Sequence, residues 1–204
     1  MTAPLGVILA GGRAMRMGGG DKGLLRLGRA TILERVRDRL EPQVAALALS
    51  ANGDPERFAG FMLPVLPDGI EDAGPLAGLL AGLDWAAGEG ATHVVTVAGD
   101  TPFFPCDLVP RLQLAAEGAG AAIALAATRG ADGLRLHPTF GLWPVALRDD
   151  LRAALAAGTR RIGRWATGMG AAEALFAIDR GDPFLNVNTP EDLALARDLA
   201  EGTA

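Results

Sequence analysis

The stretch that decides the fold is Val7-Ile8-Leu9-Ala10-Gly11-Gly12-Arg13-Ala14-Met15-Arg16-Met17-Gly18-Gly19-Gly20-Asp21-Lys22. Its first four residues form a short apolar run, which is typical of a buried strand and much shorter than a membrane span. Glycines follow at once, interleaved with Arg13, Arg16 and Lys22. Glycine lets backbone N–H groups approach a ligand closely, and cationic side chains balance negative charge. The stretch therefore indicates a loop that binds a polyphosphate directly after a strand.

Two common nucleotide-binding patterns fit this loop poorly. Residues 18–23 match G-x-G-x-x-G, but in dinucleotide-binding folds the first glycine closely follows the strand, whereas here seven residues separate Ala10 from Gly18. A Walker P-loop requires Gly-Lys-Ser/Thr, and Lys22 is preceded by Asp21 and followed by Gly23. A loop of another nucleotide-binding class is expected, and a merely flexible loop is the weaker alternative.

The length of 204 residues favours one domain, spanning residues 1–204, that can bury a single core. Half of the residues are hydrophobic, yet no apolar run is long enough for a membrane span, and we expect no secretion signal. Cys106 is the only cysteine, which excludes an intrachain disulfide and a cysteine-based zinc site and favours the cytoplasm. A net charge of −5 argues against a nucleic-acid partner.

The pattern of apolar segments predicts an α/β fold with a Rossmann-like, mostly parallel sheet flanked by helices. Expected strands lie at residues 7–10, 44–50, 61–66, 93–98, 121–127, 138–143 and 174–178. Expected helices begin at a capping box (Thr31 with Glu34), at Gly74-Pro75, at residue 145 and at Thr189-Pro190. Leu193, Ala196, Leu199 and Ala200 are expected to dock the last helix on the body.

Polar residues follow directly on several expected strands, at Gly11, Asn52, Asp68 and Asp100. Because the carboxyl ends of parallel strands share one edge of a sheet, we expect these residues around a single cleft. Turn formation is an equally good explanation for Asn52 and Asp68 taken singly. Asp100 emerges from an apolar strand across from the cationic loop, which suits holding Mg²⁺ against a triphosphate. The alternative for Asp100 is a cap for a helix near Pro105.

His93 and His137 are the only histidines, and they do not have a metal-ligand spacing. We expect His93 to be structural, whereas His137 could contact a ligand or only a backbone carbonyl. Because no nucleophile elbow for covalent catalysis is recognisable, direct group transfer is the simplest mechanism.

Several motifs in order resemble the molybdenum cofactor guanylyltransferases, which belong to the nucleotidyltransferases that use nucleoside triphosphates. Residues 9–22 follow the pattern L-A-G-G-x-x-x-R-M-G-G-x-D-K. The later motifs are Ser50-Ala51-Asn52, Asp68, Gly74-Pro75-Leu76-Ala77-Gly78, Gly99-Asp100-Thr101-Pro102-Phe103, His137-Pro138 and Asn186-Val187-Asn188-Thr189-Pro190. The resemblance covers nearly the whole chain.

This resemblance implies a fold of the nucleotide-diphospho-sugar transferase type. It implies transfer of GMP from GTP to molybdopterin carrying molybdenum, with Mg²⁺ as cofactor and molybdoenzyme maturation proteins as further partners. The residues implied in GTP binding are Leu9, Ala10, Gly11, Gly12, Lys22, Asn52, Asp68 and Asp100. Those implied in catalysis are Lys22, Asp100 and Arg16, with Asp100 as the metal ligand. Those expected on the molybdopterin side are Arg160, Arg161, Asn186 and Asn188, since the arginine fork binds phosphate bidentately.

Three alternatives remain open at this stage. A cytidylyltransferase acting on the same cofactor would share most motifs but resembles L-A-A-G at the first loop. A sugar-phosphate nucleotidyltransferase would share the fold and is usually longer. A regulatory or carrier module would bind nucleotide without catalysis, although such a module does not need both Lys22 and Asp100.

Overall fold

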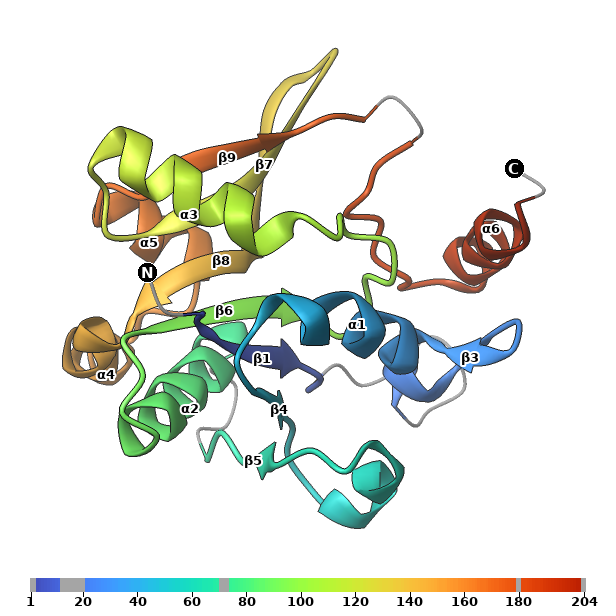
Figure 1. Cartoon of the computed structure of the whole chain (residues 1–204), viewed down its shortest axis with the longest axis horizontal. Coiled ribbons are helices and arrows are strands. Elements are labelled where there is room, and N and C mark those ends of the chain that lie inside the picture. The colour runs from blue at the N-terminus through green and yellow to red at the C-terminus, as the bar shows by residue number, and fades with distance from the viewer. Residues whose placement is uncertain (1–2, 12–20, 70–73, 179–180, 203–204) are drawn as a thin grey trace.

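The computed structural model describes residues 3–11, 21–69, 74–178 and 181–202. A seven-stranded sheet runs through it in the order β5-β4-β1-β6-β8-β7-β9 (Figure 1). Six of these strands share one direction, because β8 is antiparallel to both of its neighbours and every other pairing is parallel. The strand bounds are β1 Leu5–Leu9, β4 Leu47–Ser50, β5 Val65–Leu66, β6 His93–Ala98, β7 Ala124–Gly130, β8 Gly133–Pro144 and β9 Ala172–Phe176. The predicted mostly parallel α/β sheet is confirmed.

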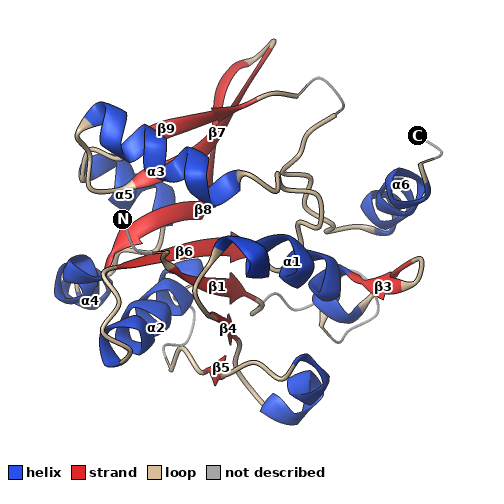
Figure 2. Cartoon of the chain, in the orientation of Figure 1, coloured by secondary structure: helices blue, strands red, loops and turns tan. Residues whose placement is uncertain are grey.

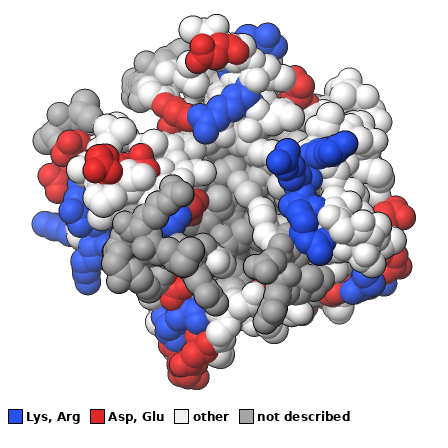
Figure 3. Space-filling view, turned by 180° about the vertical axis from the view of Figure 1, so that it is seen from behind, with Lys and Arg blue, Asp and Glu red and all other residues white. Residues whose placement is uncertain are grey.

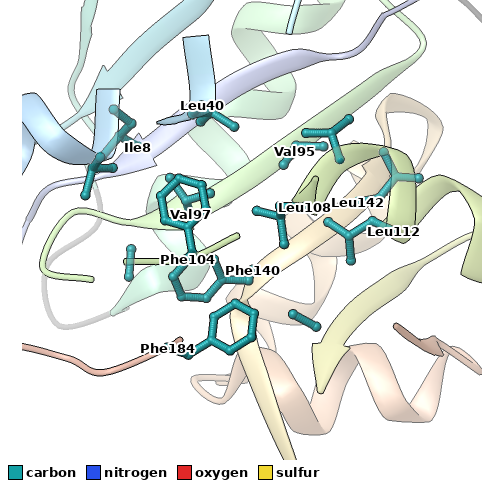
Figure 4. Close-up of a cluster of buried hydrophobic side chains, with 14 of the residues drawn as sticks. Ile8, Leu40, Val95, Val97, Phe104, Leu108, Leu112, Phe140, Leu142 and Phe184 are labelled. Carbon is teal, nitrogen blue, oxygen red and sulfur yellow. The ribbon is translucent and has the colours of Figure 1, made fainter. Parts of the chain in front are cut away.

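Helices cover both faces of this sheet (Figure 2). Their bounds are α1 Ile32–Leu40, α2 Pro75–Gly88, α3 Leu108–Ala119, α4 Arg148–Ala156, α5 Ile162–Gly168 and α6 Pro190–Glu201. The core under α1 and α3 contains Ile8, Leu40, Val97, Phe104 and Phe140 (Figure 4). A second core lies under α2, α4 and α5 and contains Val7 and Trp143. Because successive β1 side chains enter opposite cores, the strand is apolar throughout.

Glycines allow α2 to lie directly on the centre of the sheet. A Cβ at Gly82 would lie 2.8 Å from Val7 Cγ2, and one at Gly78 would lie 2.7 Å from Ser50 Oγ. Any larger residue would push the helix away from β1 and β4. No helix among the described residues is long and apolar enough to cross a membrane.

The helix starts follow the predicted cap chemistry. In α1, Glu34 N donates to Thr31 Oγ1 at 3.1 Å and Thr31 N donates to Glu34 Oε2 at 2.5 Å. Thr189 and Asp192 form the same reciprocal arrangement at α6, where Pro190 occupies the first turn. These local devices fix the start of α1 and α6 without help from the core.

α6 docks through a satellite core rather than on the main sheet. Leu27 and Ile32, from the segment with the short β2–β3 ribbon (Arg26–Leu27 and Ala30–Thr31), contact Val187 and Ala196 there. Leu193 and Ala200 pack at its margin, as expected. Leu199 was also expected to dock the helix, but it is 37% exposed and does not belong to this core.

Several predicted element bounds are wrong. The strand expected at 61–66 is reduced to the two residues of β5, because Pro55–Phe61 form a 3-10 helix that ends at a left-handed Met62. Phe61 packs edge-on against Phe58 instead of entering the sheet. The strand expected at 138–143 is the end of a much longer β8, which forms a hairpin with β7 through Gly133, where φ is +99°. Turn geometry and cross-strand pairing decide these bounds, which apolar runs do not reveal.

Candidate functional site

Four of the predicted site segments lie at one edge of the sheet, where β1, β4, β5 and β6 end. Backbone hydrogen bonds continue the sheet one residue beyond these ends. Ala10 N donates to the Ser50 carbonyl at 2.8 Å, and Gly99 N donates to the Leu9 carbonyl at 3.0 Å. Gly11, Asn52, Asp68 and Asp100 therefore emerge at the same edge, as parallel pairing requires. Gly12 and Arg16 lie outside the described residues.

Lys22 and Asp100 come together at this edge. Lys22 Nζ lies 3.9 Å from Asp100 Oδ2 and donates a hydrogen bond of 2.5 Å to Asn188 Oδ1. Thr101, which is fully buried, donates from Oγ1 to Asn186 Oδ1 and lies 3.3 Å from Asp100 Oδ1. The segment before α6 thus joins the loop after β1 to the loop after β6.

Burial raises the pKa of Asp100 above its ordinary value, while the nearby Lys22 ammonium and the Thr101 hydroxyl act in the opposite direction. Burial raises the pKa of this carboxylate by more than its present partners lower it. A divalent cation beside it would therefore stabilise its ionised form. One carboxylate with neighbouring amide oxygens suits Mg²⁺, which fills most of its octahedron with phosphate oxygens and water. Among the described residues no cluster of three or more His, Cys, Asp or Glu forms a metal cage. The residues at Asp100 fit a metal held together with a substrate.

The alternative role of Asp100 as a helix cap does not hold. Helix α3 begins at Leu108 and is preceded by Asp107. The side-chain contacts of Asp100 are with Lys22 and Thr101 instead.

Asn52 and Asp68 pair with each other across the ends of β4 and β5. Asn52 Nδ2 donates to Asp68 Oδ1 at 2.5 Å, and Asp68 N donates to Asn52 Oδ1 at 3.1 Å. Each side chain therefore bridges two strand ends, which local turn formation does not require. Asn52 is exposed and Asp68 is half-buried, so the pair is open to a ligand.

The two histidines are engaged within the protein. His93 is half-buried, and its Nδ1 lies 3.0 Å from Thr92 Oγ1, in agreement with a structural role. His137 is buried, with Nε2 2.9 Å from Thr128 Oγ1 and its ring stacked 4.3 Å from Phe184. Its partners among the described residues are therefore a hydroxyl and an aromatic ring rather than the backbone carbonyl that was one expected alternative, and contact with a ligand stays a prediction. Burial lowers the pKa of His137 to about 4.

Arg160 and Arg161 lie between α4 and α5 and line a cavity of about 380 Å³ together with Arg164. Arg160 Nη1 donates to the carbonyls of Leu155 and Thr159 at 3.0 and 2.9 Å. Arg161 and Arg164 form no ion pair or side-chain hydrogen bond with any described residue. On the side of the molecule opposite to Figure 1, Lys and Arg side chains gather beside a hollow (Figure 3). No hydrogen bond or ion pair between described residues joins this cavity to the Lys22–Asp100 network.

Two polar residues of this region escape sequence reasoning. Thr101 stands in the motif Gly99-Asp100-Thr101-Pro102-Phe103 directly after Asp100, and this position is the signal that could have identified it as a site residue. Arg57 contacts both Asp21 and the Asn52 loop, yet nothing in its surrounding sequence distinguishes it from a surface arginine.

This fold occurs in nucleotidyltransferases of known structure. It resembles a nucleotidyl transferase from Methanothermobacter, with a TM-score of 0.73, 22% identity and full coverage of both chains. It also resembles the molybdopterin-guanine dinucleotide biosynthesis protein A of Archaeoglobus fulgidus, with a TM-score of 0.72 and 20% identity over 97% of this chain and 99% of that one.

Residues 6–172 match the MobA-like NTP transferase domain, and the chain belongs to this family. A molybdenum cofactor guanylyltransferase from Cereibacter sphaeroides is 55% identical over 194 residues, which cover 95% of both chains. One from Mesorhizobium japonicum is 50% identical over 202 residues, covering 96% of this chain and 95% of its own. The family expected from the motifs is confirmed.

Proposed function

We propose that the chain, acting as one nucleotidyltransferase domain, transfers GMP from GTP to molybdopterin carrying molybdenum. The products are the guanine dinucleotide form of the cofactor and pyrophosphate. Relatives that are 50% and 55% identical over nearly their whole length carry this activity in their names. The observation in the structure that carries the proposal is the approach of Lys22 to Asp100, since phosphoryl transfer depends on positioned charge.

In the proposed reaction an oxygen of the molybdopterin phosphate attacks the α-phosphorus of GTP in line. A new P–O bond forms, and the bond from the α-phosphorus to the bridging oxygen breaks, so that pyrophosphate leaves with the electron pair. The attacking phosphate is already ionised near neutral pH, and no strong general base is required. Positioning two anions and neutralising the charge on the leaving group supply most of the rate enhancement.

The proposed roles of the described residues follow their positions. Lys22 binds the phosphates of GTP, and Asp100 holds Mg²⁺, which neutralises negative charge on the triphosphate when it is bound. Backbone groups after β1 bind nucleotide, and Asn52 and Asp68 bind the guanosine. Arg160, Arg161, Asn186 and Asn188 bind molybdopterin. The hydrogen bond from Lys22 to Asn188 supports adjacent positions for the phosphates of GTP and the molybdopterin phosphate in this proposal.

Calorimetric titration with GTP, CTP and ATP in the presence of Mg²⁺ tests the choice of base. We expect a strong preference for GTP, because a site built to hydrogen-bond one base leaves buried groups unpaired with another. A preference for CTP would support the cytidylyltransferase alternative. Binding of GTP without formation of the dinucleotide would support the carrier module.

Substitution of Arg161 tests the second substrate. Arg161→Ala is expected to reduce transfer at limiting molybdopterin at least tenfold, equivalent to about 1.4 kcal/mol, while the affinity for GTP hardly changes. Arg152→Ala is the matched control, since Arg152 is an exposed arginine paired with Asp84 away from this cavity. Equal activity of both variants would place the acceptor site elsewhere.

Two further predictions accompany this function. They are a cytoplasmic location and molybdoenzyme maturation proteins as partners of the chain.

A further inference from the structure

Arg57 links the two loops that we assign to the phosphate and base ends of GTP. Its Nε lies 2.7 Å from Asp21 Oδ2, and Asp21 directly precedes Lys22. Its Nη2 donates to the Asn52 carbonyl, and its Nη1 donates to the Asp54 carbonyl at 3.0 Å. We propose that Arg57 is a positioning residue that holds these loops in register for guanosine triphosphate; this inference rests on the proposed function.

The loop after β4 is built around the guanidinium group. Gly53 has a φ of +86°, and a Cβ at this position would lie 2.8 Å from Arg57 Nη1. The guanidinium carbon also lies 4.6 Å from the centroid of the Phe58 ring, which is almost fully buried. The planar fork is therefore fixed by a ring on its face and by two carbonyls at its edge.

A continuous set of contacts runs from the phosphate end to the base end of the proposed site. Lys22 is adjacent to Asp21, Asp21 pairs with Arg57, and Arg57 holds the backbone of Asn52. The Asn52 side chain in turn pairs with Asp68. GTP has a fixed range of distances between base and phosphates, so loops that contact both ends must keep their separation. Among the described residues, Arg57 has a side chain that contacts both the Asp21 loop and the Asn52 loop.

Arg57 does not act on the reacting atoms. Both of its Nη atoms donate to backbone carbonyls, its buried Nε forms an ion pair with Asp21 but no hydrogen bond, and its face is covered by Phe58. Its loss is expected to weaken binding and base selection rather than the chemical step. A lysine in its place could pair with Asp21, but a single ammonium cannot reproduce the planar fork that serves the carboxylate and both carbonyls.

The test compares Arg57→Ala, Arg57→Lys and Asp21→Asn with the wild-type chain and the Arg152→Ala control. The affinities for Mg²⁺-GTP and Mg²⁺-ATP are measured by calorimetry, and turnover is measured at saturating and limiting GTP. We expect Arg57→Ala to weaken GTP binding at least tenfold while ATP binding changes less than threefold. Turnover at saturating GTP should stay within twofold of wild type. Arg57→Lys should recover less than half of the lost selectivity, and Asp21→Asn should weaken GTP binding in the same direction.

The possible outcomes separate this inference from the proposed function. A wild-type chain that does not prefer GTP would contradict the proposed function. A wild-type preference for GTP that persists undiminished in Arg57→Ala and Asp21→Asn would overturn the role of Arg57. Equal loss of GTP and ATP affinity, accompanied by a lower melting temperature, would show that Arg57 only stabilises the fold. If Arg57→Ala does not fold, the ratio of GTP to ATP affinity in Arg57→Lys and Asp21→Asn tests the role of Arg57 instead.

Discussion

Acidification should destabilise this protein through His137. His137 is 7% exposed, its Nε2 hydrogen-bonds with Thr128, and its ring stacks on Phe184. Burial lowers its folded-state pKa from 6.5 to about 4, and the neighbouring Arg135 acts in the same direction while Asp182 opposes them. Because the folded pKa is the lower one, the unfolded chain binds more protons between these values. Stability is therefore lost as the pH falls through this window.

The size of the effect follows from the two pKa values. At pH 5 the ratio of protonated to neutral imidazole at His137 is about 30 to 1 in the unfolded chain, whereas the imidazole in the folded chain is mostly neutral. At about 1.4 kcal/mol per tenfold, the fold loses about 2 kcal/mol between pH 7 and pH 5, and about 3 kcal/mol by pH 4. Stacking on Phe184 places this loss beside the segment that carries Asn186 and Asn188.

Urea denaturation of the wild-type chain and of His137→Gln at pH 7 and pH 5 measures how much of the free energy of unfolding is lost through His137. Glutamine does not titrate in this range and can still donate a hydrogen bond to Thr128. Carboxylates and His93 are common to both chains, so the difference between the two pH dependences isolates residue 137. We expect the wild type to lose about 2 kcal/mol more than the variant. Equal losses would refute the assignment of His137 as a buried neutral imidazole.

Three further substitutions test the core and the site. Thr96→Val leaves the fully buried Trp143 indole N–H without its 2.9 Å partner and should cost about 1–3 kcal/mol in urea denaturation, with GTP affinity unchanged. Gly82→Ala places a methyl group 2.8 Å from Val7 Cγ2 and should cost about 1–3 kcal/mol in the same assay. Asp100→Asn should abolish Mg²⁺-dependent transfer without lowering the melting temperature at pH 7. Since burial raises the folded-state pKa of Asp100, its ionisation lowers stability as the pH rises from its ordinary pKa towards the raised one, and the neutral amide removes this effect.

Each of these has a result that would contradict it. Gly88→Ala is the control for position 82, since a Cβ there meets nothing within 4 Å; equal effects at both glycines would exclude close packing as the cause. A Thr96→Val change below about 0.5 kcal/mol would mean that the indole N–H finds another partner. Full turnover by a folded Asp100→Asn chain would remove Asp100 from the proposed metal site.

Local chemistry made much of the fold predictable. The strand at 93–98 was predicted with its observed bounds, because an apolar β-branched run ends there at Gly99-Asp100. The caps at Thr31 and Thr189 were predictable because each needs only a partner three residues away. Bounds set by cross-strand pairing, such as the start of β8 at Gly133, were missed because their partners do not show in a local pattern.

The sequence by itself determined the α/β class, the edge at which the site lies and the strand-end residues Gly11, Asn52, Asp68 and Asp100. Periodicity and parallel pairing are enough for this, since every parallel strand delivers its last residue to the same edge. Only the tertiary structure decided the partners of those residues. Lys22 meets Asn188 across 166 residues of sequence, and Thr101 meets Asn186 across 85. Such contacts depend on the docking of α6 through the satellite core, and no local pattern specifies which distant side chain a docked helix presents.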